Sequence, residues 1–163
     1  MFPCFDNVDA IQRIREKYDP LAGCIAPHIT IVFPFESDLA TYELKSHISD
    51  ALNGVKKFRV QLKDTTGDFR DGYLFLNVKN GNDQIIELHD KLYGGILQRF
   101  IYRKATYCPH LTVGRLQVAA EFDKAIQELG SFVESFETVI DKVYVENIGW
   151  NGNSVIEYTF NLE

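Results

Sequence analysis

The chain has 163 residues, of which 45% are hydrophobic and 25% are charged, and its formal net charge is -6. This composition is that of a globular protein, and its apolar runs are too short for a transmembrane helix. The negative balance argues against a protein that grips a long stretch of nucleic acid, because such binding depends on many contacts between Lys or Arg and phosphates. A small phosphorylated ligand in a locally basic pocket remains compatible with it.

The first half of the chain shows helical and strand patterns in the order helix, strand, helix, strand, strand. In chain order, we expect a helix over 8–18, a strand over 28–34, a helix over 37–52 and strands over 58–63 and 73–79. The second half repeats this order. There we expect a helix over 85–100, a strand over 110–116, a helix over 122–129, and strands over 139–148 and 155–162 that meet at an Asn151-Gly152 hairpin turn.

The spacing between the end of a helix and the next strand also repeats, from Tyr18 to His28 and from Phe100 to His110. The chain is therefore a duplicated unit, and we expect an α+β fold with a pseudo-twofold axis. This duplication predicts one bilobal domain over 1–163, with approximate repeats 1–80 and 81–163. Each lobe would have an antiparallel sheet backed by helices, with a cleft between the lobes.

The strand over 73–79 precedes the helix of the second repeat, and its counterpart in the first repeat falls before Met1. We therefore expect residues 1–5 to supply only a short or frayed strand, or the natural start of translation to lie upstream.

One four-residue phrase occurs twice, as His28-Ile29-Thr30-Ile31 and as His110-Leu111-Thr112-Val113, and each copy follows a proline. On an extended segment, side chains alternate between two faces. Each phrase thus predicts an apolar back and a front that carries one histidine and one threonine. Two matches of this kind should arise by accident in well under ~1% of chains of this length.

Two such fronts around one cleft would place two imidazoles and two hydroxyls around one bound group. This set suits acid-base chemistry on a phosphate, because the unperturbed pKa of histidine lies near working pH. One imidazole would take a proton from water and the other would give a proton to the leaving oxygen. The threonines would bind the non-bridging oxygens, so that no metal is needed. A symmetric pair leaves open which histidine is the acid.

Other histidines and the cysteines lie outside or beside the two motifs. His47 and His89 lie on helices outside the motif, and we expect them at the surface. The odd number of cysteines predicts reduced thiols in a cytoplasmic protein. Cys24 and Cys108 lie near the two motifs, but their different offsets from the histidines argue against a Cys/His metal site.

Arg115, just after the second motif, either reaches the phosphate or pairs with an acidic residue. Four aromatic residues near the motifs either stack on a base or pack in the core or rim: Phe33, Phe35, Tyr73 and Tyr107.

The paired H-x-T-x motifs in a bilobal repeat resemble the two-histidine (2H) phosphoesterase superfamily, in particular its bacterial RNA 2′,5′-ligase and cyclic nucleotide phosphodiesterase branch. The run from Pro109 to Arg115 is similar to the second motif of that branch. The segments 17–20, 27–30 and 33–35 resemble a small bacillus-type subgroup of phosphoesterases. Members of the superfamily normally open with a full strand before the first helix, and this chain departs from them there.

The resemblance implies that His28 and His110 are the catalytic pair and that Thr30 and Thr112 bind the phosphate. Arg115 would be a further substrate contact. The implied activity is metal-independent hydrolysis of a 2′,3′-cyclic phosphate, or of a 2′,5′-linked nucleotide or RNA end, without a cofactor and away from membranes. The alternative is a non-catalytic nucleotide-binding or regulatory protein that keeps the cleft.

Overall fold

The structure, a computed structural model, describes residues 1–150 and 152–163. The strands are β1 (Phe58–Asp68), β2 (Tyr73–Asn80), β3 (His110–Arg115), β4 (Ser135–Ile140), β5 (Lys142–Ile148) and β6 (Ser154–Asn161). The helices are α1 (Val8–Tyr18), α2 (Thr41–Leu52), α3 (Asn82–Leu92), the 3₁₀ helix η1 (Gly95–Phe100) and α4 (Ala119–Leu129). Each described helix falls short of the length and apolarity that a membrane crossing requires.

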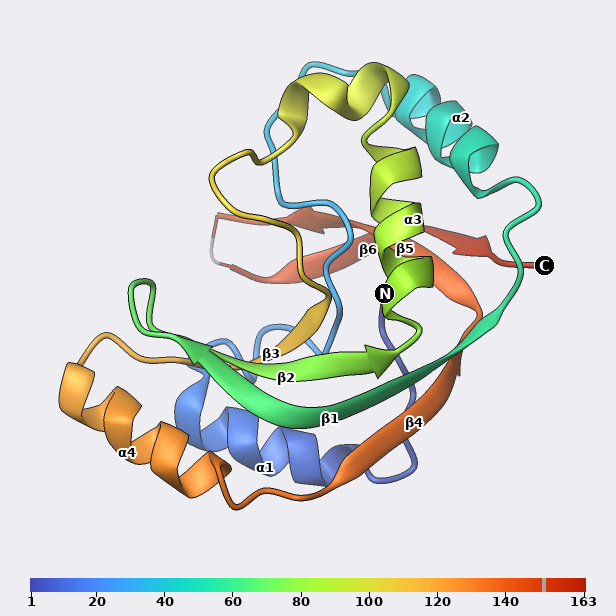
Figure 1. Cartoon of the computed structure of the whole chain (residues 1–163). Coiled ribbons are helices and arrows are strands. Elements are labelled where there is room, and N and C mark those ends of the chain that lie inside the picture. Colours follow the sequence, from blue (N-terminus) through green and yellow to red (C-terminus); the bar gives the residue numbers. More distant parts are fainter. Residues whose placement is uncertain (151) are drawn as a thin grey trace.

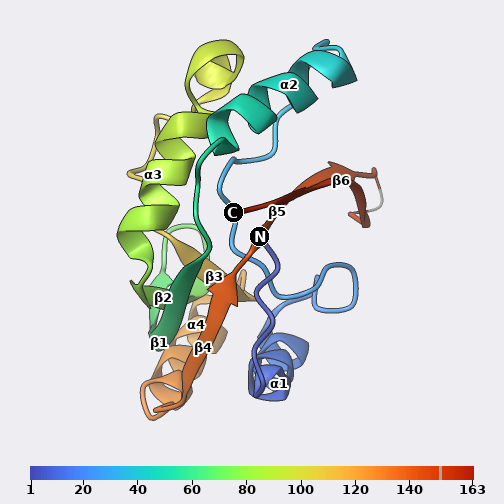
Figure 2. The same cartoon turned by 90° about the vertical axis from the view of Figure 1, so that its right-hand side faces the viewer.

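Four strands form an antiparallel sheet in the order β3-β2-β1-β4, and β5 pairs with β6 in a separate hairpin. Helices α1 and α4 lie below the larger sheet in the view of Figure 1, where α1 contacts β3 and α4 contacts β1. Helices α2 and α3 lie above it and contact each other. Figure 2 shows the β5–β6 hairpin on the opposite side of the molecule from α3.

One face of the larger sheet is apolar because its strands alternate as the sequence predicts. Leu74, Leu76 and Val78 of β2 are buried, whereas the residues between them are partly exposed. The buried set continues across β3 with Leu111 and Val113. The other face of β2 and β3 therefore carries the side chains that remain accessible to a ligand.

The sheet takes β1 and β2 from the first repeat and β3 and β4 from the second. The repeats 1–80 and 81–163 are thus interleaved in space, and neither forms a lobe by itself. One lobe contains the four-stranded sheet and the other contains the β5–β6 hairpin. The chain's first residues lie beside β5 in both views and belong to this second lobe (Figures 1 and 2). There Phe2 meets Tyr144 edge to face, with ring centroids 5.2 Å apart.

Two helices differ from the sequence-based expectation. The helix expected over 85–100 is divided into α3 and η1 at Gly94-Gly95, because Gly95 takes a left-handed φ of 54° that an α-helix does not contain. The helix expected from residue 37 begins at Thr41. The expected helix over 122–129 is confirmed and starts three residues earlier, at Ala119.

The strands differ more. The segment expected as a strand over 28–34 forms only one isolated bridge, at Ile29. β1 runs on to Asp68, beyond the expected end at residue 63. The strand expected over 139–148 is two strands in different sheets, which separate at Asp141. The strand expected over 155–162 is β6, which pairs with β5. Asn151 of the expected turn lies outside the described residues.

Residues 1–5 form no full strand, as expected. Met1 and Ile29 nevertheless exchange two backbone hydrogen bonds, of 2.8 and 2.9 Å. Ile29 also bridges to Leu111. The first motif therefore lies between the N-terminal segment and β3, as a short link between the two lobes.

Candidate active site

The two motifs lie side by side because their central residues, Ile29 and Leu111, form an antiparallel bridge. Both side chains are fully buried, at 0% exposure. The residues that flank them alternate to the opposite face. In antiparallel register, each histidine lies across from the threonine of the other motif. The bridge thus brings His28, Thr30, His110 and Thr112 to one face, where each is partly exposed.

The two imidazoles are held in the same way. Nδ1 of His28 lies 3.0 Å from the carbonyl oxygen of Ala26, and Nδ1 of His110 lies 2.7 Å from that of Cys108, two residues earlier in each case. A carbonyl oxygen can only accept, so Nδ1 carries the proton in both rings. Nε2 is then the atom that each ring offers for proton transfer.

Burial lowers the pKa of both imidazoles, and the hydrogen bond to the backbone carbonyl offsets only part of that effect. Aromatic rings contribute to this environment. The Phe75 ring lies 4.1 Å from the His110 ring, centroid to centroid, and the Phe2 ring lies 5.9 Å from the His28 ring. Both histidines are therefore mainly neutral at neutral pH in the unliganded protein.

Arg115 shares the face of Thr112 because β3 is irregular between them. Thr112 faces Phe75 and Gly114 faces Leu74, so the register shifts by one residue between these pairs. Without this bulge, Arg115 would lie on the face of Leu111 and Val113, since strand side chains have a period of two. The bulge instead pairs Arg115 with Tyr73, whose ring centroid is 5.8 Å from the guanidinium carbon.

Gly114 lies at this bulge and is closely packed. An added Cβ there would lie 2.8 Å from Cδ1 of Leu74 and 3.0 Å from Cβ of Tyr18. A side chain at residue 114 would require the side chains of Leu74 and Tyr18 to shift. Of the two outcomes expected for Arg115, the structure shows the pairing with an acidic residue, because its Nη1 donates to Oδ1 of Asp19.

Three aromatic side chains hold the first motif where it lacks a strand partner. The Tyr107 hydroxyl donates to the carbonyl oxygen of Thr30 over 2.7 Å, and the Tyr93 hydroxyl accepts from the Phe33 amide over 3.0 Å. Nδ1 of His89 lies 2.6 Å from the carbonyl oxygen of Ile31.

The expectation that His89 lies at the surface is wrong. Its exposure is 6%, and its ring stacks on that of Tyr107 with centroids 3.7 Å apart. Its position on α3 at helical spacing from Ile85 and Leu92 was the available signal, because that spacing marks the buried face. His47 is partly buried, and its Nε2 lies 2.8 Å from the carbonyl oxygen of Leu92, outside the motifs.

The four aromatic residues considered for base stacking contact other rings in the structure. Phe35 stacks on Phe100 with centroids 4.4 Å apart, and Phe33 contacts Tyr107. Tyr73 lies parallel to Phe75, with centroids 6.0 Å apart. Each ring lies at the rim or in the core, and Tyr73 and Phe75 share the face of the motif residues.

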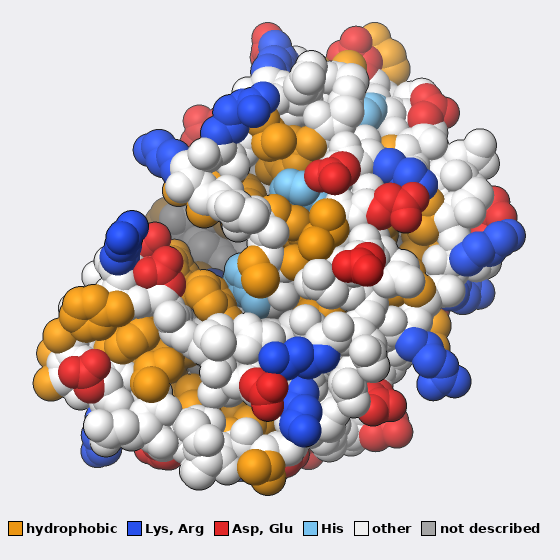
Figure 3. Space-filling view, in the orientation of Figure 1, with side chains coloured by type: hydrophobic (Ala, Val, Ile, Leu, Met, Phe, Trp, Pro, Cys, Tyr) orange, Lys and Arg blue, Asp and Glu red, His pale blue; other side chains and the backbone are white. Residues whose placement is uncertain are grey.

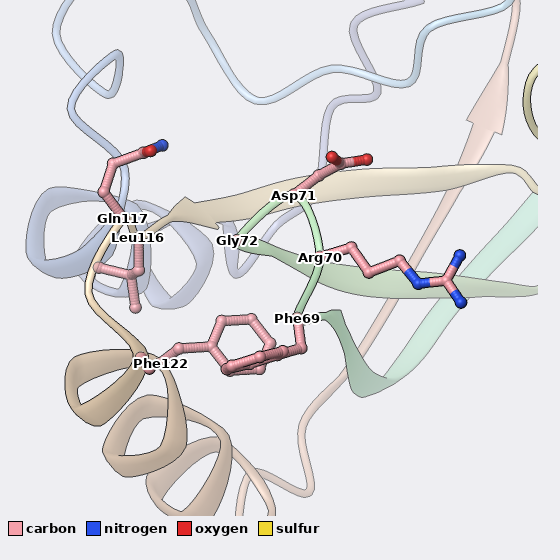
Figure 4. Close-up of a pocket in the computed structure, with 8 residues that line it drawn as sticks. Phe69, Arg70, Asp71, Gly72, Leu116, Gln117 and Phe122 are labelled. Carbon is pink, nitrogen blue, oxygen red and sulfur yellow. The ribbon is translucent and has the colours of Figure 1, made fainter.

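Figure 3 shows the surface hollowed at the left of the view, with a histidine side chain at the edge of the hollow and Lys and Arg side chains above it. A separate pocket of about 270 Å³ lies between the β1–β2 turn and the start of α4, lined by residues such as Phe69, Leu116 and Phe122 (Figure 4). None of the motif residues lines it. We place the candidate site at the bridge between the motifs.

The cysteines form no disulfide, and Cys4 and Cys108 are exposed. Across the described residues, no group of three or more His, Cys, Asp or Glu side chains is arranged to hold a metal ion.

An α+β fold with curled antiparallel sheets that brings two H-x-T-x segments together is typical of the two-histidine phosphoesterases. Residues 5–148 match the family model of the 2′-5′ RNA ligase superfamily. The chain belongs to that superfamily, and the resemblance found in the sequence is confirmed.

Curated relatives cover the whole chain at low identity. A protein of Bacillus licheniformis named "putative phosphoesterase" is 26% identical over 169 residues, which are 99% of this chain and 95% of that protein. A protein of Geobacillus kaustophilus with the same description is 26% identical over 165 residues, with 98% and 92% covered.

Solved structures share the fold. Escherichia coli LigT complexed with 3′-AMP matches with a TM-score of 0.58 and 16% identity, over 99% of this chain and 96% of LigT. LigT complexed with ATP matches with a TM-score of 0.54 over the same shares. At these identities the likeness shows the fold alone.

Proposed function

We propose that this protein is a metal-independent phosphodiesterase. It hydrolyses a 2′,3′-cyclic phosphate, or a 2′,5′-linked nucleotide or RNA end, by acid-base catalysis with His28 and His110. The observation that carries this proposal is the Ile29–Leu111 bridge, which sets the two imidazoles on one face with Nδ1 of each held by a backbone carbonyl.

The reaction on a cyclic phosphate exchanges one P–O bond for another. Water attacks phosphorus, and Nε2 of one neutral imidazole takes the proton that the water loses. The bond from phosphorus to one ribose oxygen breaks, and Nε2 of the other imidazole, in its protonated form, gives that oxygen a proton. The products are a phosphate monoester and a free ribose hydroxyl. A 5′-hydroxyl in place of water would form a 2′,5′ linkage.

One imidazole must be protonated when the substrate is bound, although burial lowers the pKa of both. The negative charge of the bound phosphate favours this protonation. An anion beside an imidazole favours its protonated form and raises its pKa. Substrate binding and protonation of the acid are therefore coupled.

The hydroxyls of Thr30 and Thr112 would donate to the non-bridging oxygens, on which negative charge develops. Arg115 would add a positive charge at the end of the second motif. A nucleotide substrate is supported by the solved structures of similar fold, since LigT has been crystallised with 3′-AMP, ATP and NADP⁺.

Incubation with 2′,3′-cyclic nucleotides and with 2′,5′-linked adenylates, followed by product analysis, tests this function. A 3′,5′-linked dinucleotide serves as the matched control substrate. We expect hydrolysis of one of the first two classes, no change of rate in EDTA, and a loss of turnover on the order of 10²- to 10⁴-fold in the His28→Ala or His110→Ala protein. Binding of these compounds without turnover would favour the non-catalytic alternative, and a loss of activity in EDTA that zinc restores would overturn the metal-independent mechanism.

A further inference from the structure

A buried carboxylate, Asp19, contacts Arg115 at the end of the second motif. It is the first residue after α1, and its side chain has 0% exposure. Arg15 donates to Oδ2 through Nε and Nη2, over 3.2 and 3.1 Å. The Leu21 amide donates to Oδ1 over 3.1 Å, and Nη1 of Arg115 donates to the same oxygen. Both carboxylate oxygens are thus fully used by hydrogen-bond donors.

The cluster of Asp19, Arg15 and Arg115 carries an excess of positive charge, because one carboxylate lies between two guanidinium groups. Arg15 is 1% exposed, and its Nη1 is buried without a hydrogen-bond partner among the described residues. A buried charge is costly unless it is paired. Arg15 already satisfies Oδ2, so Asp19 does not need Arg115 for its own neutralisation.

Arg115, which Asp19 does not need for neutralisation, is the arginine of this cluster that remains accessible to solvent. The Arg115 side chain is 22% exposed, against 1% for Arg15. Across residues 1–150 and 152–163, Nη1 of Arg115 donates to Asp19, whereas its Nε and Nη2 make no hydrogen bond. The bulge puts Arg115 on the face of Thr112 and its side chain is partly exposed, so these two donors are the ones left to bind a ligand on that face.

The same carboxylate connects the two motifs. Asp19 opens the segment that leads to His28, and its Oδ1 fixes that segment through the Leu21 amide. Arg115 is the last residue of β3, which carries the second motif. One oxygen atom therefore joins the approach to the first motif to the end of the second.

We propose that Asp19, anchored by Arg15, is a positioning residue that fixes the Arg115 guanidinium so that its free donors face a phosphate oxygen beside Thr112. This inference rests on the proposed function of the same site. Asp19 touches no substrate in this arrangement and acts through Arg115. A guanidinium that is already held at one nitrogen loses less conformational freedom when the phosphate binds. If such a group is displaced, the reaction rate falls even when the chemical step is unchanged.

A double-mutant cycle distinguishes this positioning role of Asp19 from a role in the stability of the fold alone. Asp19→Asn keeps the shape of the side chain and removes its charge. If Asp19 acts through Arg115, we expect Asp19→Asn to lower kcat/KM about 10- to 100-fold in the wild-type background. In an Arg115→Ala background, the same change should alter kcat/KM less than about twofold. Asp19→Glu should restore part of the loss, and thermal unfolding of each variant gives its stability separately.

Equal losses of kcat/KM in both backgrounds would overturn the proposal, because Asp19 would then act without Arg115. A second measurement uses the unaltered protein, so that it does not depend on the folding of a variant. Inorganic phosphate is titrated while the NMR signals of the arginine side chains and of the imidazoles are followed. We expect the Nε–H signal of Arg115 to shift together with His28 and His110, and that of Arg15 to shift much less.

A shift of the imidazole signals without any shift of Arg115 would refute the role of Asp19 and leave the proposed function standing. If neither the imidazoles nor Arg115 respond to phosphate, and neither a 2′,3′-cyclic phosphate nor a 2′,5′-linked nucleotide is hydrolysed, the proposed function itself fails.

Discussion

Ile29 and Leu111 face each other in a single antiparallel bridge, and each is the central residue of one H-x-T-x motif. Because neighbours of bridged residues also face each other, each histidine lies across from the threonine of the other motif. The site is thus assembled from both repeats, and neither motif supplies a complete set of groups. The loss of one motif residue should therefore affect the whole site.

Replacement of His28 or of His110 by Ala should lower kcat by on the order of 10²- to 10⁴-fold, because each group moves one of the two protons. The double variant should be only slightly worse than the worse single variant, since residues that act as a unit are not additive. Steady-state kinetics on a 2′,3′-cyclic nucleotide measures both effects.

The matched control for the histidine variants is His47→Gln, which alters a histidine outside the motifs and should change kcat by less than about twofold. Full activity of the His28→Ala protein would remove that residue from the mechanism.

The rate should depend on pH with a maximum on the acid side of neutrality. Burial lowers the pKa of both His28 and His110 from the ordinary value of 6.5. The reaction needs one neutral and one protonated imidazole, and the optimum of kcat/KM lies between the two pKa values of the free enzyme. Both values are below 6.5, so kcat/KM should increase as pH falls from 8 and peak below about 6.5.

NMR titration of the two imidazole rings measures these pKa values directly. Phe75→Thr should raise the pKa of His110 towards its ordinary value, because the Phe75 ring shields that imidazole from water. A maximum of kcat/KM above pH 7 in the wild-type protein would contradict the assignment.

Removal of a motif hydroxyl should cost less than removal of an imidazole. Thr30→Val and Thr112→Val keep the shape of the side chain and remove one hydrogen bond to a charged oxygen, so each should raise the activation free energy by ~1–3 kcal/mol. Thr→Ser at the same positions keeps the hydroxyl and is the control. If the Val variants are as active as the Ser variants, the hydroxyls do not bind the phosphate.

Gly114→Ala should destabilise the fold by ~1–3 kcal/mol, because its Cβ would overlap Leu74 and Tyr18. It should also lower kcat/KM, since relief of the overlap moves the bulge that aims Arg115. Urea unfolding measures the stability. The control is Gly23→Ala, where an added Cβ meets nothing within 4 Å, and the free energy of unfolding should stay within about 1 kcal/mol of the wild type. Equal stability of the two variants would show that β3 tolerates a side chain at residue 114.

The sequence alone determined the composition of the site face. A period of two places His and Thr on one side of each motif and Ile or Leu on the other, whatever the segment pairs with. The repeated spacing before each motif predicted the duplication, and the helical spacing of α1 and α4 predicted those helices. These properties follow from local geometry, which the sequence carries within a few residues.

Other features were decided by contacts between distant segments. The offset from Thr112 to Arg115 is odd, and only the bulge against β2 returns Arg115 to the site face. Residues 28–34 have a strand pattern, yet the ladder is limited to Ile29, where neighbours exist on both sides.

The burial of His89 was also decided by contacts between distant segments. The position of His89 beneath the first motif depends on the packing of α3 against a segment nearly sixty residues earlier, at Ile31. Side-chain alternation is a property of a single extended chain, whereas register, bulges and burial are properties of the partner that the chain meets. The sequence therefore determined which groups could act together, and the tertiary structure decided which of them meet.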